Sequence, residues 1–172
     1  RMETLNRAYR LARRLKETHH LQAILRALAD VNTARAKHIE ALTYAEQLLM
    51  LGKKTDDPIS ETLGHRTTGV SHFFLGNYLK AREYLESGIS CYQALVSSRC
   101  DPSQIPYTEE MVFLWAWLPH ILFALGYPDQ AVESSHQALN RVQPDSHVHV
   151  KAKMLTVAGA TFHTMTRDPK AV

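Results

Sequence analysis

Between residues 62 and 92, hydrophobic positions recur with the period of an α-helix, in two runs separated by a short turn. The second run carries apolar or small residues at the spacing of a half-buried helix: Ala81, Tyr84, Leu85, Gly88, Ile89 and Tyr92. Gly76 can end the first helix in a left-handed conformation, and Asn77 can cap the second. The segment is therefore predicted to form a helical hairpin. One hairpin cannot bury both of its apolar stripes, so neighbouring copies are expected.

The same pattern fits the chain three more times, in frames that begin at Gln22, Val112 and Ala152. With Thr62 as position 1, position 20 is alanine in every frame: Ala41, Ala81, Ala131 and Ala171. Position 8 is small or compact in every frame: Ala29, Gly69, Pro119 and Gly159. Two helices that cross closely require such residues at their contact. These positions are therefore predicted to lie where the two helices of each hairpin meet.

The frames organise residues 1–172 as one all-helical domain. It is predicted to contain the second helix of a preceding repeat at 1–20, repeats at 22–58, 62–95 and 108–144, and a partial repeat at 146–172. Asp57-Pro58 is typical of an N-cap followed by proline in the first helical turn. Pro119 lies inside a predicted helix and is expected to kink it without ending it. Pro144–Ser146 begins the last full helix.

Asp168-Pro169 is predicted to begin a helix that the chain ends before completing. The domain is therefore interpreted as a piece of a longer array. Apolar stripes at its ends would lack their neighbours, and self-association through the terminal helices is expected.

Several segments resemble known repeat families. Two segments resemble the tetratricopeptide repeat. One is Trp115-x-x-Leu118 followed by Gly126, Ala131 and Ala138, and the other is Thr68-Gly69 followed by Gly76-x-Tyr78-x-x-Ala81. Three further segments, at 45–49, 73–76 and 125–131, resemble the repeat region of large bacterial signalling proteins. Those proteins combine a nucleotide-cyclase or kinase-like domain with a regulatory ATPase. The resemblance implies a right-handed superhelical stack of antiparallel helix hairpins.

Composition agrees with a helical globular chain: 172 residues, of which 45% are hydrophobic and 22% charged. The longest apolar run, from Met111 to Leu125, is shorter than a membrane span and is interrupted by Pro119 and His120. The first residues form a charged amphipathic pattern and not a secretory signal. Cys91 and Cys100 have no metal or redox spacing, and a disulfide is not expected. Together these features predict a cytoplasmic protein without a membrane partner.

The net charge of +3 does not require a nucleic-acid partner. The basic residues of the first helix are nevertheless clustered: Arg7, Arg10, Arg13, Arg14 and Lys16. A solvated outer face is favoured over a phosphate-binding patch for this cluster.

No pattern of catalytic or cofactor-binding residues is present. The ten histidines include His19-His20 and His147-x-His149, whose spacings direct the two rings of a helical pair away from one another. The sequence has no HExxH, no glycine-rich phosphate loop and no recognisable triad. The chain is therefore predicted to be neither an enzyme nor a metal or cofactor protein.

The tetratricopeptide resemblance implies a concave groove lined by the first helix of each repeat. Its candidate partner-binding residues are Arg26, Asp30, Arg66, Phe73, Phe74, Phe113, His120, Phe123, Lys153 and His163. Basic groups at the ends and aromatic groups between them suit a peptide with apolar anchors and some negative charge. The alternative is that Phe73, Phe74 and Phe123 pack in the core between helices.

Two functions follow from this interpretation. The first is a non-catalytic scaffold that binds a protein segment, or a neighbouring domain of its own polypeptide, in the groove. The second is a sensor that binds a small effector or signalling peptide and regulates an attached ATPase or cyclase domain. A polar pocket rimmed by Arg66, His120 and His163 would favour the sensor, and exposed aromatic side chains would favour the scaffold.

Overall fold

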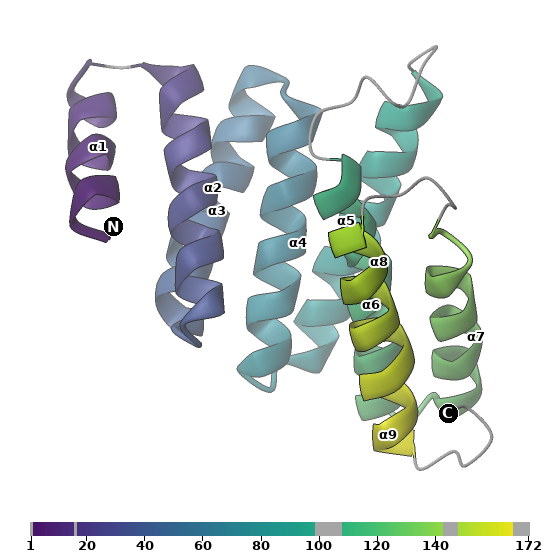
Figure 1. Ribbon diagram of the computed structural model, residues 1–172. Coiled ribbons are helices and arrows are strands. Elements are labelled where there is room, and N and C mark those ends of the chain that lie inside the picture. The colour runs from purple at the N-terminus through teal and green to yellow at the C-terminus, as the bar shows by residue number, and fades with distance from the viewer. Residues whose placement is uncertain (1, 16, 99–107, 143–147, 167–172) are drawn as a thin grey trace. The chain divides into compact units, whose positions relative to one another are not determined.

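The computed structural model describes residues 2–15, 17–98, 108–142 and 148–166. Within these ranges the regular elements are helices, with no strand (Figure 1). The prediction of an all-helical fold is confirmed, while the right-handed superhelix stays a prediction. The chain divides into two compact units, residues 1–100 and 101–172. None of the described helices combines the length and the apolar character needed to cross a membrane.

The first unit consists of two stacked helical hairpins preceded by one helix. Its elements are α1 (Met2–Leu15), α2 (Thr18–Ala34), α3 (His38–Thr55), α4 (Pro58–Phe74) and α5 (Tyr78–Ser97). Each helix packs against the next along the chain, and α2 also contacts α4. Figure 1 shows α2 and α4 side by side, with α3 and α5 behind them. The first helices of the two hairpins therefore form one layer and the second helices another.

The second unit contains one hairpin and a further helical segment. Its elements are α6 (Thr108–Ala124), α7 (Pro128–Leu139), α8 (Val148–Met154), the π-helical η2 (Leu155–Thr161) and α9 (Phe162–Thr166). The first two form the hairpin, and η2 packs against both of them. As predicted, α6 continues through Pro119. The beginning predicted at Pro144–Ser146 and the helix predicted at Asp168-Pro169 lie outside the described residues.

The π-helical turn η2 was not expected from the sequence, which has the period of an ordinary α-helix there. A π-helix carries i→i+5 hydrogen bonds and leaves room for a side-chain donor to reach the backbone. The buried hydroxyl of Ser135, on α7, donates a hydrogen bond of 2.6 Å to the carbonyl oxygen of Ala158, within η2. The neighbouring hairpin thus satisfies part of the altered backbone.

The turns of the three hairpins are copies of one another. The residue at position 15 has positive φ in each, at Ala36 (56°), Gly76 (77°) and Gly126 (84°). Backbone N–H groups of residues 75–77 donate to the carbonyls of residues 71–73, and the same three bonds recur 40 residues earlier and 50 residues later. The predicted hairpin turns are therefore confirmed as a helical repeat in both units.

The two predicted N-caps have different outcomes. Asp57 caps α4 as predicted, because its carboxylate accepts a hydrogen bond from the N–H of Ile59 at 3.1 Å. Asn77 precedes α5, but its side chain makes no capping hydrogen bond, so that prediction is wrong. Its Nδ2 lies 3.5 Å from Nδ1 of His72 instead. With ψ at 62°, the Asn77 backbone is not extended as a side-chain cap requires.

The left-handed position gives opposite expectations for two substitutions. Gly76→Ala should destabilise the chain by about 1–2 kcal/mol, since a Cβ there meets no atom within 4 Å and only the backbone conformation is unfavourable. Ala36→Gly should stabilise it by about 0.5–1 kcal/mol, because relief of strain exceeds the added entropy of the unfolded chain. Urea unfolding followed by circular dichroism measures both. A destabilising Ala36→Gly would contradict the turn assignment.

The small residues predicted at helix crossings are buried contacts. Ala41, Ala81 and Ala131 are completely buried. A Cβ on Gly69 would lie 2.7 Å from Cδ2 of Leu85 and 3.2 Å from the carbonyl oxygen of Ala81, both on α5. The crossing predicted between Gly69 and Ala81 is therefore confirmed. Ala171, the fourth member of the position-20 set, lies outside the described residues.

Candidate functional site

Three charged residues of the predicted groove meet on the face formed by α2 and α4. Arg66 donates from Nη2 to Oδ1 of Asp30 at 2.6 Å, which joins the two first helices. Arg26, one turn before Asp30 on α2, approaches its other oxygen at 3.9 Å. The side chain of Arg66 is 14% exposed. Arg66 therefore serves mainly to hold the two hairpins together, and it presents little of its charge to a ligand.

The aromatic groove residues of the first unit lie at the end of α4. The ring of Phe74 stacks on the imidazole of His38, with centroids 4.5 Å apart and planes at 10°. Phe73 meets Phe74 edge-on at 5.2 Å and contacts Tyr78 at 5.9 Å. Phe74 is 49% exposed, so it is not a core residue. The contact with His38 instead links the tips of the two hairpins across their outer surface.

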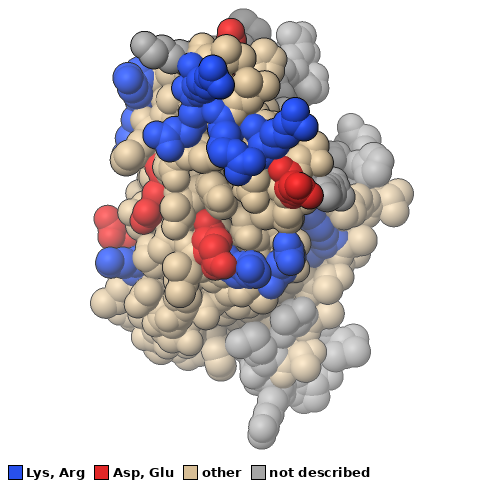
Figure 2. All heavy atoms as spheres, turned by 90° about the vertical axis from the view of Figure 1, so that its left-hand side faces the viewer, with Lys and Arg blue, Asp and Glu red and all other residues tan. Residues whose placement is uncertain are grey.

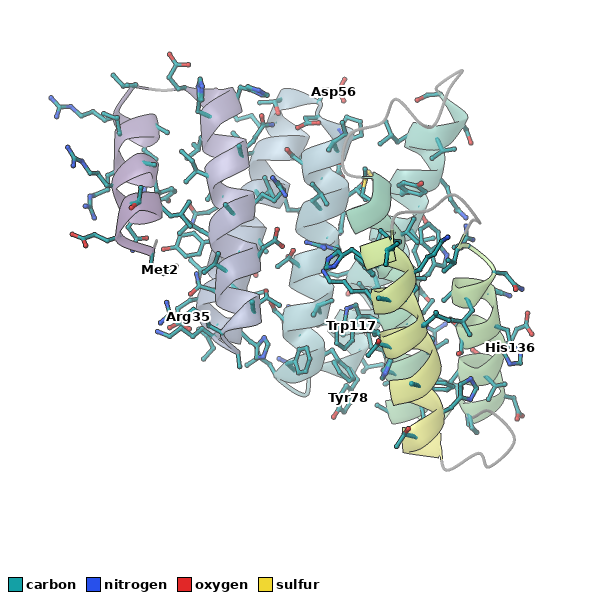
Figure 3. The ribbon with its side chains drawn as sticks, in the orientation of Figure 1. Met2, Arg35, Asp56, Tyr78, Trp117 and His136 are labelled. Carbon is teal, nitrogen blue, oxygen red and sulfur yellow. The ribbon has the colours of Figure 1, made fainter. Side chains whose placement is uncertain are left out.

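Two further apolar side chains follow members of this cluster in the sequence. Ile39 follows His38 in the first turn of α3, and Leu79 follows Tyr78 in the first turn of α5; they occupy position 18 of their frames and are 68% and 75% exposed. Figure 3 shows Arg35 and Tyr78, at the two hairpin tips, at the same end of the unit and opposite Asp56. We call this end the tip surface, and define it by His38, Ile39, Phe73, Phe74, Leu75, Tyr78 and Leu79. Side chains this exposed contribute little to folding, which makes the surface a candidate contact area.

A second feature of the first unit is a cavity of ≈ 440 Å³ between α1 and α2. Its lining is partly apolar and partly charged: Thr4, Leu5, Arg26, Ala27, Asp30 and Val31. The volume falls within the range of small-ligand sites, and the arginine and aspartate provide one group of each charge. Two predicted groove residues therefore also line a cavity that the sequence did not reveal.

In the second unit, the predicted groove residues surround a buried ring. His120, Phe123 and His163 contact Phe162, with ring centroids 5.7, 6.2 and 5.5 Å apart. Phe123 packs on the core cluster formed by Leu122, Ala131 and Phe162. His120 is buried, and burial lowers its pKa. Phe123 therefore packs in the core between helices, which was the alternative to a place in the groove.

The remaining two candidates of this unit contact one another. Lys153 places its Nζ 4.9 Å from the centroid of the Phe113 ring, a cation–π arrangement. Phe113 itself is buried. Lys153 is exposed, so this pair offers charge but no accessible aromatic face.

Two histidines of α4 are held neutral in the first unit. Burial, with a smaller effect from Lys53, lowers the pKa of His65 to about 4. Its Nε2 lies 3.8 Å from a carboxylate oxygen of Glu61. Burial also lowers the pKa of His72, whose ring stacks on Tyr84 at 5.5 Å. Neither histidine carries positive charge to a ligand at neutral pH.

The lowered pKa of His65 predicts a loss of stability in acid. Between about pH 6.5 and pH 4 the unfolded chain binds a proton that the folded chain does not, so the free energy of unfolding should fall as the pH falls. Urea midpoints at pH 7.5 and 4.5 should differ less for His65→Gln than for the unchanged protein. His20→Gln, on the exposed side of α2, is the matched control. An unchanged pH dependence in His65→Gln would contradict the assignment.

Among the residues that the structure describes, no three histidine, cysteine, aspartate or glutamate side chains are grouped to hold a metal ion. No protein-family model matches the sequence, and a search of curated proteins finds no match. Inference about function therefore depends on the two features of the first unit, the tip surface and the cavity.

Of the tip surface, the sequence predicted only Phe73 and Phe74 as site residues, and it missed the other five: His38, Ile39, Leu75, Tyr78 and Leu79. The signal that could have found Ile39 and Leu79 is their spacing of 40 residues, which places an apolar residue at position 18 of two successive frames. That position faces solvent at the beginning of the second helix. His38 carries no comparable signal, because its importance comes from Phe74 on another helix.

Proposed function

We propose that the chain is a non-catalytic interaction module that binds a segment of a partner protein, or a neighbouring domain of its own polypeptide, through the tip surface and the adjoining face of α2 and α4. The observation that supports this function is the exposure of Ile39, Phe74 and Leu79 at the tips of two neighbouring hairpins. Exposed aromatic and aliphatic side chains close together are typical of contact residues in protein interfaces.

The charges at the tips favour a partner with acidic groups. Arg35 and Lys37 lie in the turn between α2 and α3, and Lys80 lies in the first turn of α5; all three are exposed. A partner segment with one or two apolar anchors and flanking carboxylates would complement both features. Opposite charges of this kind mainly accelerate association and make it sensitive to salt.

We further propose that the repeats form a tetratricopeptide-like superhelix within a larger cytoplasmic signalling protein. The repeated hairpin turns and the side-by-side packing of α2 and α4 support a continuing stack. The resemblance of residues 45–49, 73–76 and 125–131 to bacterial signalling proteins supports the wider setting. The alternative function, sensing of a small effector, is favoured by the ≈ 440 Å³ cavity between α1 and α2.

A selection from a displayed library of random peptides tests the proposed function. Selected peptides are expected to be rich in apolar and acidic residues. Phe74→Ala combined with Leu79→Ser should weaken their binding at least tenfold, because the few residues that dominate an interface each cost about 2 kcal/mol or more when truncated. Met50→Ser is the matched control, since the exposed fraction of Met50 on α3 lies between those of Phe74 and Leu79, but Met50 lies outside the tip surface.

The comparison of the two variants shows whether the peptides bind at the tip surface. An equal loss of affinity in the Met50→Ser control, or full binding by a folded Phe74→Ala, Leu79→Ser variant, would contradict the assignment of binding to the tip surface. Peptides that bind the unchanged protein and compete with one another would support it. Circular dichroism of each variant establishes that the fold is retained.

A further inference from the structure

The ring of Phe74 is contacted from the neighbouring hairpin. Phe74 ends α4, whereas His38 begins α3 and belongs to the preceding hairpin. The two rings lie almost parallel, with planes at 10° and centroids 4.5 Å apart. Phe73 meets the Phe74 ring edge-on, with planes at 68°. The imidazole thus stacks on a residue that is still 49% exposed to a partner.

Both rings are attached to fixed points of the backbone. The N–H of Lys37, just before the histidine, donates to the carbonyl oxygen of Asn32 at 2.9 Å. The N–H of Leu75, just after the phenylalanine, donates to the carbonyl oxygen of Ser71 at 3.0 Å. Because these turns hold the two backbones, the orientation of each ring depends on its side-chain torsions and on the groups that it contacts.

The two hairpins are also fixed relative to one another. Arg66 of α4 donates to Asp30 of α2 at 2.6 Å. A Cβ on Gly64 would lie 2.9 Å from the backbone of Leu49, so α3 and α4 pack closely. A side chain at the beginning of α3 is therefore held at a constant place beside the end of α4.

The imidazole of His38 provides a flat surface to Phe74. Its Nδ1 is buried and forms no hydrogen bond with the described residues. Parallel aromatic rings attract one another, and such a pair contributes energy beyond the area that it buries. A benzene ring at position 38 would keep this contact, whereas a methyl group would remove it.

We propose that His38 is a positioning residue of the tip surface, whose imidazole holds the ring of Phe74 in the orientation that a partner contacts. The inference rests on the proposed function, because it assigns a role in binding at the same surface. A ring that is oriented before binding loses less conformational entropy when the partner arrives, so positioning raises affinity. Since the two rings belong to different hairpins, the affinity for the partner depends on the stacking of both.

The first measurement uses the chain without a partner. In the NMR spectrum, the ring current of Phe74 should shift the stacked ring protons of His38 upfield. Phe74→Leu should remove this shift at a pH above 8, where the imidazole is neutral in both proteins. Leu79→Ser, which changes no ring, should leave it in place. An equal spectrum of His38 in Phe74→Leu and in the unchanged chain would contradict the stacked pair.

The second measurement is an anisotropy titration with a labelled peptide from the displayed library, chosen because its binding requires Phe74 and Leu79. His38→Ala should weaken its binding about threefold to tenfold, as for loss of a stacked aromatic pair. His38→Phe should bind within about twofold of the unchanged chain. In a Phe74→Leu background, His38→Ala should cause no further loss, because the ring that it positions is absent.

The first unit has a second basic surface, which requires a charge control for an acidic peptide. Arginine side chains of α1 are exposed, and Figure 2 shows Lys and Arg side chains gathered over this face: Arg7, Arg10, Arg13 and Arg14. Arg10→Gln combined with Arg14→Gln should leave the binding unchanged. His19→Ala, exposed in the first turn of α2, is the matched histidine control and should also leave it unchanged.

Three results would overturn the role of His38 alone. One is equal binding of the peptide by His38→Ala and the unchanged chain. Another is a loss in His38→Phe as large as in His38→Ala, since the partner would then contact the imidazole itself. The third is an equal loss in the Arg10→Gln, Arg14→Gln variant. If no selected peptide requires Phe74 and Leu79, the proposed function fails and this role fails with it. Circular dichroism establishes that each variant is folded.

Discussion

Replacing Gly64 by alanine is expected to destabilise the first unit by about 2 kcal/mol, although alanine is the better helix former. A Cβ at this position would lie 2.9 Å from the backbone N and Cα of Leu49, so α3 and α4 would have to separate. The loss of stability should be larger than for Gly69→Ala, where the nearest atom belongs to the flexible end of the Leu85 side chain. Gly159→Ala should be neutral or stabilising, since its nearest neighbour is at 3.7 Å.

Urea unfolding of the three variants, followed by circular dichroism, gives the order of stability. The Gly64 variant should show the lowest midpoint. Because the chain has two compact units, tryptophan fluorescence follows the second unit separately, since both tryptophans, Trp115 and Trp117, lie there. A Gly64→Ala variant as stable as Gly159→Ala would show that α3 and α4 are packed less closely than described.

Reversing the charge of Arg66 is expected to lower the free energy of unfolding about as much as Gly64→Ala does. Arg66→Glu would place a carboxylate beside Asp30 between two packed helices, and a loss of about 2–3 kcal/mol is expected, between the values for exposed and for buried ion pairs. The sequence alone led to a different expectation, because it placed Arg66 among the partner-binding residues of the groove. The 2.6 Å bond to Asp30 assigns the residue to the stability of the stack instead.

A charge swap tests the Arg66 prediction. The double variant Arg66→Asp, Asp30→Arg should recover at least half of the stability that each single change removes, because it restores an opposite pair at the same contact. Arg82→Glu serves as the control: Arg82 pairs with Glu86 one turn away on an exposed face, and its loss should cost about 0.5 kcal/mol or less. Equal losses for Arg66→Glu and Arg82→Glu would mean that the α2–α4 pair does not stabilise the unit.

Local features of the fold could be predicted from the sequence, because they depend on neighbouring residues. The turn at Gly76 and the cap at Asp57 each favour a particular residue type at one backbone position. The small residues at positions 8 and 20 follow from the helical period. Contacts between distant segments had no such signal: the sequence does not indicate that Gly64 meets Leu49.

The candidate site was harder to predict than the fold, for a related reason. Arg66 and Asp30 were both named for the groove, but their direct bond depends on how two hairpins stack. The same counting that placed Phe74 on the groove also placed Phe123 there, and only the first of these rings is exposed. Which face of a helix is covered depends on its neighbours and cannot be derived from its own period.

The π-helical turn η2 also matters for how this repeat can change in evolution. A turn with i→i+5 bonds holds one residue more than an α-helical turn, so side chains beyond it are rotated relative to an unbroken count. His163 was assigned to the groove by such a count, and it lies buried against Phe162. A single inserted codon is therefore enough to move a residue from one face to another while both ends of the helix keep their contacts. Deleting Ala160 is expected to reverse this rotation.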